Sequence, residues 1–510
     1  MLNQEIKNRI TQLWDMFWSG GMANPLTALE QISYLLFMRR AEDVGLVQLN
    51  KYKWSVYTKE EKYQSDLPNY MKDVFGYIKT LNSKQKSFKE AMRGANFEIT
   101  KPSLLQAAIE LIDEIYLEAE KERKGGQYFQ DTLGDFYEHI LRQTSEAGKN
   151  GQFRTPRHII QLMCEILEPN INDTICDVTA GTSGFLVGAY QYIIKQHSSE
   201  KFIIDENGFE KKTSGNKIRP GSLKEKKLTE STFFGYDIDA TMIRLGIMNL
   251  LMHNIKKPNI KHLDSISQEF DKTEKGVQYS KILANPPFTG RIDSLEATTS
   301  SEIYPPLNRN GKRVKQTIQS EILFLERIIQ LLKVGGKAAV IIPEGLLFGS
   351  ANAPTKIRKI LLTQCSLDAV ISLPSGVFMP YSGVKTSILV FTKGRIKRTG
   401  YSTKKVWFYG MDSDGYSLDA NRKALKDKPL PKVRDAFKLR KKNSDDNRAQ
   451  KHFYVPIENI KDNGYQLSFN QYKSFVYENQ EFESPESLLD RLLDLEREIF
   501  KETEQLKKIA

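Results

Sequence analysis

Cysteine and histidine are scarce in this 510-residue sequence. Its three cysteines, Cys164, Cys176 and Cys365, lie far apart without CxxC spacing, and only six histidines occur. A zinc site needs closely spaced ligands and a disulfide framework needs paired cysteines, so neither is indicated and we expect no bound metal. This sparing use of cysteine suits a reducing compartment, and we expect the protein in the cytoplasm.

Long hydrophobic runs are missing as well. No stretch approaches the roughly eighteen consecutive apolar residues of a membrane-spanning helix, and the start of the chain lacks the apolar core of a signal peptide. We therefore expect no membrane partner. The sequence also has no GxxxxGK[ST] phosphate loop, no helix-turn-helix signature and no zinc finger, so these common ways of binding nucleotides or reading DNA sequence are not indicated.

Positive charge, in contrast, is abundant. The 75 Lys and Arg residues exceed the 63 Asp and Glu residues by 12. Basic side chains that neutralise phosphates release counterions, so this balance favours a polyanionic partner, although a merely solvated basic surface would have the same composition. With 40% hydrophobic residues, a chain of this length can bury a large core and is expected to form two or three domains.

Residues 1–145 are predicted to form a helical N-terminal domain, because apolar residues return at three- and four-residue intervals. Examples are Leu26, Leu29, Ile32, Leu35 and Leu36. Residues 17–25 contain Gly, Asn and Pro and predict a loop between two helices, and residues 52–66 form a polar connection with several aromatics. Those aromatics could stack on bases, but packing between helices is the more frequent use.

From about residue 170, short β-branched segments alternate with helical ones. This alternation predicts a βαβ series and an α/β fold with a doubly wound, mostly parallel sheet, in a catalytic domain over residues 146–400. The expected strands are 174–178, 232–236, 281–284, 337–342, 367–373 and 386–392. The expected helices are 183–196, 240–253, 320–332 and 355–364. Polar insertions at 198–231 and 289–319 interrupt the series, and both mobile loops over a site and solvated excursions fit them.

The remainder of the chain is strongly charged. Residues 393–405 and 419–451 are dense in Lys, Arg and Asp, like a linker or a phosphate-facing surface, and residues 401–483 are predicted to be a basic linker and tail. Residues 484–510 place apolar residues among charges at helical spacing, which predicts a C-terminal amphipathic helix. It has room for about three heptads, so a helix that docks a partner subunit and a helix folded back on its own chain both remain open.

A glycine-containing turn follows the first predicted strand. The strand ends at Asp177 and continues into the turn Val178-Thr179-Ala180-Gly181-Thr182-Ser183-Gly184. Gly181 and Gly184 allow a ligand to approach the backbone closely, and ligands of α/β sheets bind at the carboxyl ends of the strands. The turn is therefore a candidate cofactor site, although a tight connection alone can have the same composition.

Two later strand ends carry carboxylates. Asp237 ends the second strand, where it could accept both hydroxyl groups of a ribose. Its alternative role, as N-cap of the helix that begins near residue 240, suits Asp239 better. A further strand end precedes His262, and Asp264, which follows it, could contact the adenine end of a nucleoside or cap a loop.

The predicted strand 281–284 runs directly into Asn285-Pro286-Pro287-Phe288. Two prolines restrict the backbone, so the Asn285 side chain and the Pro286 carbonyl become two rigid hydrogen-bond acceptors. The amino group of a nucleobase is a poor nucleophile because its lone pair is delocalised into the ring. Two acceptors that hold its N–H groups localise this pair and stabilise the positive charge that develops on methylation. Phe288 offers a face for a base that has left the duplex. A plain diproline turn explains this tetrapeptide less well.

With these motifs, the chain resembles the amino-methyltransferases, and specifically the modification (M) subunits of type I restriction-modification systems. The resemblance extends over nearly the whole length and implies methylation of N6 of adenine in DNA. The resembling segments are DTLGDFYE (131–138), AGKNGQFRTPR (147–157), LLFG (346–349), SGVF (375–378), GVKTS (383–387) and GYQLS (464–468).

The resemblance implies S-adenosylmethionine as the cofactor. Its expected contacts are Gln152, Phe153, Arg154, Thr155, Pro156, Arg157, Asp177, Thr179, Ala180, Gly181, Thr182, Gly184, Asp237 and Asp264. The expected catalytic residues are Asn285, Pro286, Pro287 and Phe288. The turn departs from the commonest pattern of the superfamily at Val178, Ala180 and Ser183, where proline, cysteine and a smaller residue are usual. These changes are small or apolar, so they bear on cofactor affinity more than on cofactor use.

The resemblance also implies partners. These are double-stranded DNA, a specificity (S) subunit, a second M subunit and a restriction (R) subunit that can join. The lack of a recognisable DNA-reading motif fits a specificity that a separate subunit supplies. Two rivals remain open: methylation of RNA or of a protein glutamine, since NPP[FY] serves these reactions too, and a catalytically silent scaffold that binds DNA.

Overall fold

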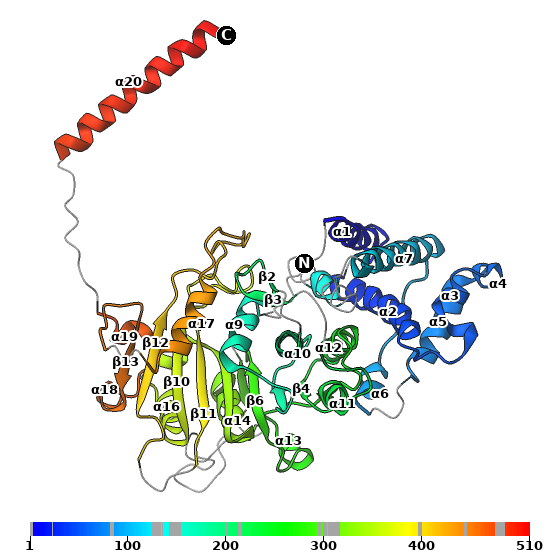
Figure 1. The fold of residues 1–510 in the computed structure, drawn as a ribbon, viewed down its shortest axis with the longest axis horizontal. Helices are drawn as coiled ribbons and strands as arrows, with labels where there is room; N and C mark the ends of the chain where they lie inside the picture. Colours follow the sequence, from blue (N-terminus) through cyan, green and yellow to red (C-terminus); the bar gives the residue numbers. More distant parts are fainter. Residues whose placement is uncertain are drawn as a thin grey trace. The chain divides into compact units, whose positions relative to one another are not determined.

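The computed structural model contains a mixed sheet flanked by helices in the larger of two units, Met1–Tyr472 (Figure 1). The second unit, Lys473–Ala510, is treated by itself below. The structure describes residues 4–22, 24–81, 86–124, 134, 136–141, 155–198, 202–212, 217–288, 290–293, 297–298, 303, 317–395, 400–442, 446–474 and 485–509.

Nine strands form this sheet within the described part of the chain. They are β1 (Ile175–Asp177), β4 (Phe233–Asp237), β5 (Asn259–His262), β6 (Tyr279–Ala284), β9 (Leu332–Pro343), β10 (Cys365–Ser372), β11 (Thr386–Lys393), β12 (Lys405–Gly410) and β13 (His452–Pro456). Their order is β13-β12-β10-β11-β9-β6-β1-β4-β5. The run from β9 to β5 is parallel, β11 is antiparallel to both neighbours, and β13 is antiparallel to β12. The predicted doubly wound, mostly parallel α/β fold is confirmed, with all six predicted strands.

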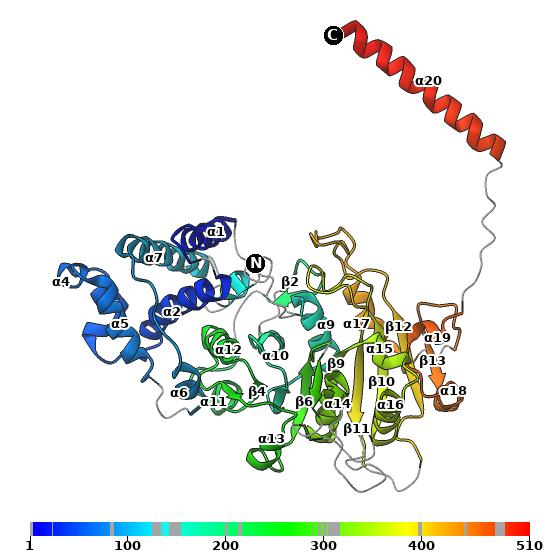
Figure 2. The same ribbon diagram turned by 180° about the vertical axis from the view of Figure 1, so that it is seen from behind.

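Each face of the sheet has its own apolar core and its own helices (Figures 1 and 2). Successive strand residues point to opposite faces, so Leu283 and Ile341 lie in one core while Ile282 and Val340 lie in the other. The first core includes residues of α9 (Arg157–Leu167), α10 (Gly184–Gln196), α11 (Leu223–Glu230), α12 (Ala240–Met252) and α17 (Leu430–Leu439). The second includes residues of α13 (Gln268–Thr273), α14 (Ser320–Leu331), α15 (Glu344–Phe348), α16 (Asn352–Gln364), α18 (Ile457–Asp462) and α19 (Phe469–Tyr472).

The N-terminal part is helical, as predicted. It contains α1 (Gln4–Ser19), α2 (Pro25–Asp43), η1 (Asn50–Tyr52), α3 (Trp54–Tyr57), α4 (Glu61–Gln64), α5 (Leu67–Ile78), α6 (Lys86–Met92) and α7 (Pro102–Lys124). Asn24 caps α2, and Pro25 occupies its first turn. This part packs on α12 of the catalytic region, where the Arg244 guanidinium lies 2.6–2.7 Å from Glu30 Oε1.

The aromatics of residues 52–66 pack between helices. Trp54 and Tyr57 are buried, and the Trp54 indole N–H donates to Asp113 Oδ1 at 2.8 Å. Tyr52 stacks on Tyr77 with ring centroids 4.5 Å apart. The packing interpretation of these residues is therefore confirmed.

The prediction that residues 401–483 are a linker and tail is wrong for much of that segment. β12 pairs with β10 and β13 pairs with β12, so both are strands of the main sheet. Trp407, Phe408 and Phe453 are buried there. The charged residues that flank these short strands lower the average hydropathy of the region, which hides a local pattern of only five or six residues.

Both polar insertions contain regular structure. In 198–231, β2 (Phe202–Ile204) pairs with β3 (Glu210–Lys212), and α11 follows. In 289–319, β7 (Arg291–Asp293) pairs with β8 (Thr317–Gln319), so the two ends of this insertion are held together directly after the Asn285 tetrapeptide.

The second unit contains one helix in its described residues, α20 (Pro485–Ile509). Its apolar side chains are about half exposed or more. They are Leu488, Leu489, Leu492, Leu493, Leu495, Ile499 and Phe500. Among the helices that the structure describes, α20 included, none is long and apolar enough to cross a membrane.

Candidate active site

The predicted site residues follow two neighbouring strands at the centre of the sheet. The chain places β4 and β5 on one side of β1, and β6 and β9 on the other, so the strand order reverses between β1 and β6. In open α/β sheets, a ligand crevice forms outside the carboxyl ends of the strands at such a reversal. β1 ends there with Asp177, and β6 leads there into Asn285, with Cys176 paired to Ile282.

Backbone hydrogen bonds fix the glycine turn to the ends of β1 and β4. The Thr179 N–H donates to Asp177 Oδ1 at 3.0 Å, and the Gly181 N–H donates to Asp237 Oδ2 at 2.8 Å. Gly181 has a φ of 48°, in the left-handed region that glycine adopts readily, and the fully buried Ser183 has a φ of 63°. The turn thus brings together Asp177, Thr179–Thr182 and Asp237, as predicted from sequence, just before Gly184 begins α10.

Both carboxyl groups at this turn have raised pKa values. Burial raises the pKa of Asp177 to about 7, with a further contribution from the nearby Asp237, against the lowering effect of the Thr179 N–H. Burial also raises the pKa of Asp237, although the N–H groups of Asp239 and Gly181 oppose this shift. Two neighbouring carboxyl groups that are shielded from water favour a ligand that carries positive charge or hydrogen-bond donors.

Asp239, and not Asp237, caps the following helix, as the sequence suggested. Its side chain accepts from the N–H groups of Thr241 and Met242 at 2.8 and 3.1 Å. A carboxylate has about four lone-pair sites, so Asp237 can still accept hydroxyl donors besides its two N–H partners.

Asp264 lies close to the same turn. The Ser265 hydroxyl after β5 donates to the Val178 carbonyl at 2.9 Å, which joins the two loops. Asp264 itself is half-buried and accepts from the Ile266 N–H at 3.0 Å, so a loop-capping role is observed and a ligand contact stays a prediction.

Helix α12 supports the turn in a way that the sequence analysis missed. A Cβ added to Gly246 would lie 2.6 Å from Ser183 Oγ and 2.8 Å from the Gly181 carbonyl oxygen, so only glycine allows this approach. The buried Asn249, one helical turn later, donates from Nδ2 to the Thr182 carbonyl at 2.8 Å and to Glu138 Oε1 at 2.5 Å. A glycine inside an apolar helix was the available signal, since it costs helix stability and usually has a packing reason.

Asn285 directly follows β6 and is half-buried. Its Oδ1 atom is covered from solvent and accepts no hydrogen bond from the residues that the structure describes. Pro286 is buried and Pro287 is exposed. A covered acceptor without a donor is costly, which makes this oxygen a candidate acceptor for an N–H group of a ligand.

Phe288 is less open than expected for a stacking platform. Its ring is 4% exposed and packs edge-on against Phe378, with centroids 5.2 Å apart and an interplanar angle of 83°. Phe378 belongs to the SGVF segment noted in the sequence, 90 residues later in the chain. That segment had no predicted contact with Phe288.

Half of the segment expected before the glycine turn lies within the described residues. Gln152, Phe153 and Arg154 are outside them. Thr155 and Pro156 lead into α9, and Arg157 Nη2 donates to Gln191 Oε1 of α10 at 3.3 Å. The segment therefore ends beside the helix that the glycine turn begins.

The residues of this crevice fit a nucleoside cofactor. Apart from its chain neighbours, no described residue has a heavy atom within 4 Å of the position that a Cβ on Gly181 would take, so these residues leave room for a ligand against the turn. Asp237 has acceptor sites that suit ribose hydroxyls, and the buried Asp177 has a carboxyl group whose ionised form a cationic ligand would favour.

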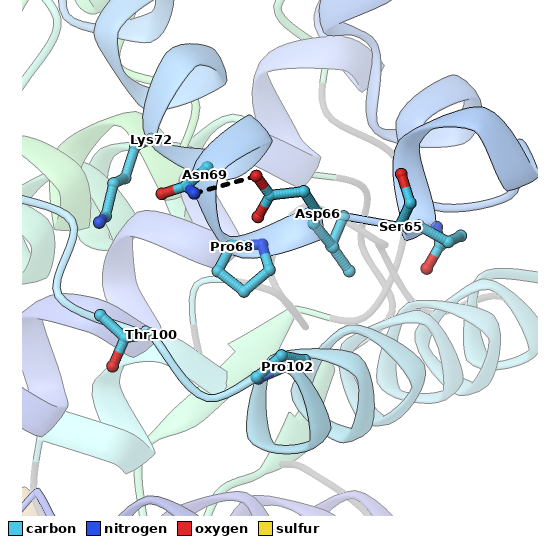
Figure 3. A pocket seen from close by; sticks show the side chains of 9 residues that line it. Ser65, Asp66, Pro68, Asn69, Lys72, Thr100 and Pro102 are labelled. Atoms are coloured by element: carbon cyan, nitrogen blue, oxygen red, sulfur yellow. Dashed lines mark hydrogen bonds between the residues drawn. The ribbon is translucent and has the colours of Figure 1, made fainter.

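A separate hollow of about 320 Å³ lies in the N-terminal helical part (Figure 3). It is lined by residues around the start of α5 and the start of α7, among them Asp66, Lys72 and Thr100. Asn69 Nδ2 donates to Asp66 Oδ2 at 3.0 Å on its wall. None of the predicted site residues lines it.

Comparison with known proteins agrees with this architecture. A sequence model of N-6 DNA methylases matches residues 128–481, and one of the HsdM N-terminal domain matches residues 6–124. The chain is 30% identical over 412 residues to the type I restriction enzyme EcoEI methylase subunit of Escherichia coli, covering 76% of this chain and 74% of that protein. It is 26% identical over 424 residues to the EcoKI methylase subunit of E. coli K12, covering 81% and 72%.

Solved structures share the fold. A methyltransferase subunit of a type I restriction-modification system from Streptococcus thermophilus has a TM-score of 0.63 and 19% identity, covering 92% of this chain and 99% of that chain. A chain from another type I restriction-modification system has a TM-score of 0.67 and 22% identity, covering 99% and 98%. The resemblance drawn from the sequence motifs is therefore confirmed. The chain belongs to the N-6 DNA methylase family and, within it, to the methylase subunits of type I restriction enzymes.

Proposed function

We propose that this protein transfers a methyl group from S-adenosylmethionine to N6 of an adenine in double-stranded DNA. The observation that carries the proposal is the covered, unpartnered Oδ1 of Asn285 at the end of β6, beside the acid-lined glycine turn at the end of β1. One strand end thus offers an acceptor for an amino group, and its neighbour offers a site for a positively charged nucleoside.

The chain's own part in the reaction is to hold the amino group. Asn285 Oδ1 and the Pro286 carbonyl accept its two N–H groups, localise the nitrogen lone pair and stabilise the positive charge that develops on that nitrogen. Pro286 and Pro287 keep both acceptors in place, since their fixed φ angles leave the backbone little freedom. Most of the rate then comes from positioning and electrostatic stabilisation.

The cofactor-binding residues are assigned by the same reasoning. Asp237 would accept the ribose hydroxyls, Gly181 and Gly184 would admit the ligand against the turn, and Asp177 would face its positive end. Gln152–Arg157 would cover it from α9, and Asp264 would contact its adenine. S-adenosylmethionine, when bound, supplies the electrophilic methyl group.

Phe288 is proposed to stack on the target base. Because Phe378 now covers the ring, such stacking requires the two rings to separate when DNA binds. A base that has been flipped out of the duplex must be held by stacking as well as by hydrogen bonds.

Cofactor binding is expected to depend on pH through Asp177. Its pKa of about 7 is raised above the value of an unfolded aspartate, so its contribution to stability is fully present below about pH 4 and is lost progressively as pH rises from there through 7. A ligand with sulfonium and ammonium groups favours the ionised carboxylate. We therefore expect the dissociation constant of S-adenosylmethionine to fall about tenfold between pH 6 and pH 8.

Isothermal titration calorimetry at several pH values measures this effect. Asp177→Asn should bind more weakly and show little change over the same range. A wild-type affinity that is independent of pH would contradict the assignment of Asp177 to the cofactor's positive end.

Specificity is proposed to come from a separate S subunit, with a second M subunit and, in the full complex, an R subunit. We propose that α20 is the docking helix for the S subunit, because its apolar stripe is exposed within its own unit. Changing four residues of that stripe to serine should weaken assembly at least tenfold, as measured by analytical ultracentrifugation. These residues are Leu488, Leu492, Leu495 and Ile499.

A matched control changes four charged residues of α20 at the same spacing. They are Asp490, Asp494, Arg497 and Lys501, whose replacement by serine leaves the net charge unchanged. This variant should assemble normally. If the apolar-stripe variant assembles like the wild type, α20 is not part of the interface with the S subunit.

The function itself is tested by transfer of a labelled methyl group. Unmethylated DNA should become labelled at N6 of adenine when both the chain and its S subunit are present, and nuclease digestion with mass spectrometry identifies the product. Label in RNA or in a protein glutamine would favour the rival substrates. Binding of DNA without any transfer would instead favour a silent scaffold.

A further inference from the structure

A loop after β12 crosses the carboxyl edge of the sheet before α17 begins. We call residues 411–428 the strap. It leaves the sheet at Met411, whose N–H donates to the Ser372 carbonyl at the end of β10 at 3.0 Å. Within the strap, Tyr416 pairs with Ala424 in an isolated β-bridge, so it is a folded element.

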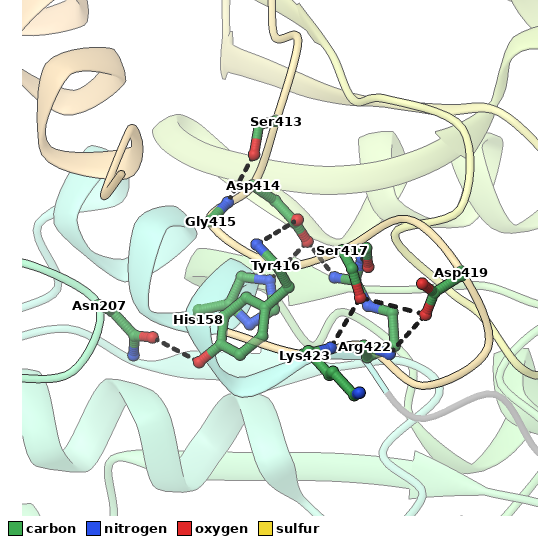
Figure 4. A network of polar contacts seen from close by, with 10 residues as sticks. All are labelled: His158, Asn207, Ser413, Asp414, Gly415, Tyr416, Ser417, Asp419, Arg422 and Lys423. Atoms are coloured by element: carbon green, nitrogen blue, oxygen red, sulfur yellow. Dashed lines mark hydrogen bonds and ion pairs between the residues drawn. The ribbon is translucent and has the colours of Figure 1, made fainter. Parts of the chain in front are cut away.

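The strap is fixed at one end by the carboxylate of Asp414, whose side chain is fully buried (Figure 4). This carboxylate accepts from His158 Nε2 at 2.8 Å and forms an ion pair with Arg422 of the same strap. The Tyr416 ring stacks on His158 with centroids 4.5 Å apart, and its hydroxyl donates to Asn207 at 3.1 Å. His158 is therefore held from two sides by the strap.

His158 belongs to the cofactor side of the crevice. It is the second residue of α9, directly after Thr155, Pro156 and Arg157. α9 in turn packs tightly on α10, because a Cβ on Gly188 would lie 2.4 Å from the Ile160 side chain. A shift of His158 would thus move the wall that precedes the glycine turn.

The middle of the strap contacts the target side of the crevice. A Cβ on Gly376 would lie 2.3 Å from the Leu418 carbonyl oxygen, and Gly376 has a φ of 93°. Two residues later, Phe378 packs on Phe288 of the Asn285 tetrapeptide. The strap therefore contacts both walls of the crevice at once.

The charged groups around Asp414 keep the hydrogen bond between Asp414 and His158 in one protonation state. His158 and Arg422 hold the pKa of Asp414 below its usual range despite burial, and burial holds the pKa of His158 below its usual range. Near neutral pH, a charged carboxylate thus accepts from a neutral imidazole that donates through Nε2. Hydrogen bonds to a charged acceptor are stronger than neutral ones, which suits a fixed spacing.

We propose that Asp414 is a positioning residue that, through His158 and the strap, sets the spacing between the cofactor wall at α9 and the base wall at Phe378 and Phe288. The inference rests on the proposed function, because it takes those walls to bind S-adenosylmethionine and adenine. Neither Asp414 nor His158 needs to touch a substrate.

The test is Asp414→Asn in the full chain, assayed with DNA and the S subunit at 25 °C. We expect KM for S-adenosylmethionine to rise and kcat to fall, each on the order of tenfold, because both walls lose their fixed spacing. Asp419→Asn is the matched control. Asp419 is an exposed carboxylate of the same strap that accepts from the Asn421 and Arg422 N–H groups, and its loss should change either constant less than about twofold.

A pair of His158 variants tests the same contact without leaving a buried arginine unpaired. His158→Gln keeps an N–H donor toward Asp414 and should restore most of the activity that His158→Leu loses. A lowered melting temperature of Asp414→Asn and His158→Leu with unchanged KM and kcat would show that the contact only stabilises the fold.

Calorimetric binding of S-adenosylmethionine separates this inference from the proposed function. If the wild-type chain binds the cofactor but methylates no DNA, the proposed function fails. A weaker cofactor affinity of Asp414→Asn would then still support the role of the strap at α9, and an unchanged affinity would overturn it.

Discussion

Asn285→Ala is expected to abolish detectable methylation of DNA, with kcat reduced by at least roughly 10²- to 10³-fold, while the dissociation constant of S-adenosylmethionine changes less than about twofold. The substitution removes the covered Oδ1 acceptor that has no partner among the described residues. It leaves the glycine turn, Asp177 and Asp237 in place, because their hydrogen bonds involve other atoms. Loss of rate without loss of cofactor affinity is the signature of a group that acts on the amino nitrogen.

Asn285→Asp is the matched variant for this test. It keeps the size of the side chain and an oxygen acceptor, so it should retain more activity than the alanine variant. Radiolabelled transfer to DNA gives kcat, and calorimetry gives the cofactor affinity. If the alanine variant methylates DNA with a kcat within about tenfold of the wild-type value, the Asn285 acceptor is not needed for the reaction.

The strand ends that carry the candidate site residues could be predicted from the sequence because the patterns that mark them are local. β1, β4 and β6 are short apolar segments, and each leads within one residue of its end to Asp177, Asp237 or Asn285. Parallel strands bring such ends to one edge of a sheet, so pattern and topology together placed these residues near one another. The division of roles between Asp237 and Asp239 was also local, since an N-cap precedes its helix by one position.

The contacts that support the site could not be predicted because they join residues that are far apart in the sequence. Gly246 meets the turn at Gly181, 65 residues earlier in the chain, and the sequence of α12 alone does not reveal which face approaches what. Phe378 covers Phe288 from a different strand connection, which a tetrapeptide pattern cannot show. Asp414 and His158 are 256 residues apart.

The misassigned region 401–483 shows a different limit. β12 is six residues long and β13 five, and both are flanked by charged residues that dominate any longer window. Their burial comes from pairing at the edge of the sheet that β10 and β11 provide. A short strand at such an edge is specified more by the sheet it joins than by its own composition.

Gly246→Ala is expected to have the next largest effect, a loss of cofactor affinity of up to roughly 10²-fold. The new Cβ would lie 2.6 Å from Ser183 Oγ and 2.8 Å from the Gly181 carbonyl oxygen, and a backbone oxygen cannot move without moving the turn. Overpacking of this kind costs about 1–3 kcal/mol. Each 1.4 kcal/mol by which it destabilises the cofactor-binding conformation of the turn weakens affinity about tenfold. Calorimetry with S-adenosylmethionine measures the loss of cofactor affinity. Thermal unfolding measures how much of the cost lowers the stability of the whole fold.

Gly76→Ala is the control for helix propensity. Gly76 also lies in a helix, α5, but beyond that helix's own backbone no described residue has a heavy atom within 4 Å of the position of its Cβ. Alanine should therefore raise the free energy of unfolding by up to about 1 kcal/mol there and leave cofactor binding unchanged. Intact cofactor affinity in Gly246→Ala would mean that the turn can shift away from α12 and still bind its ligand. The contact between α12 and the turn would then be a matter of packing alone.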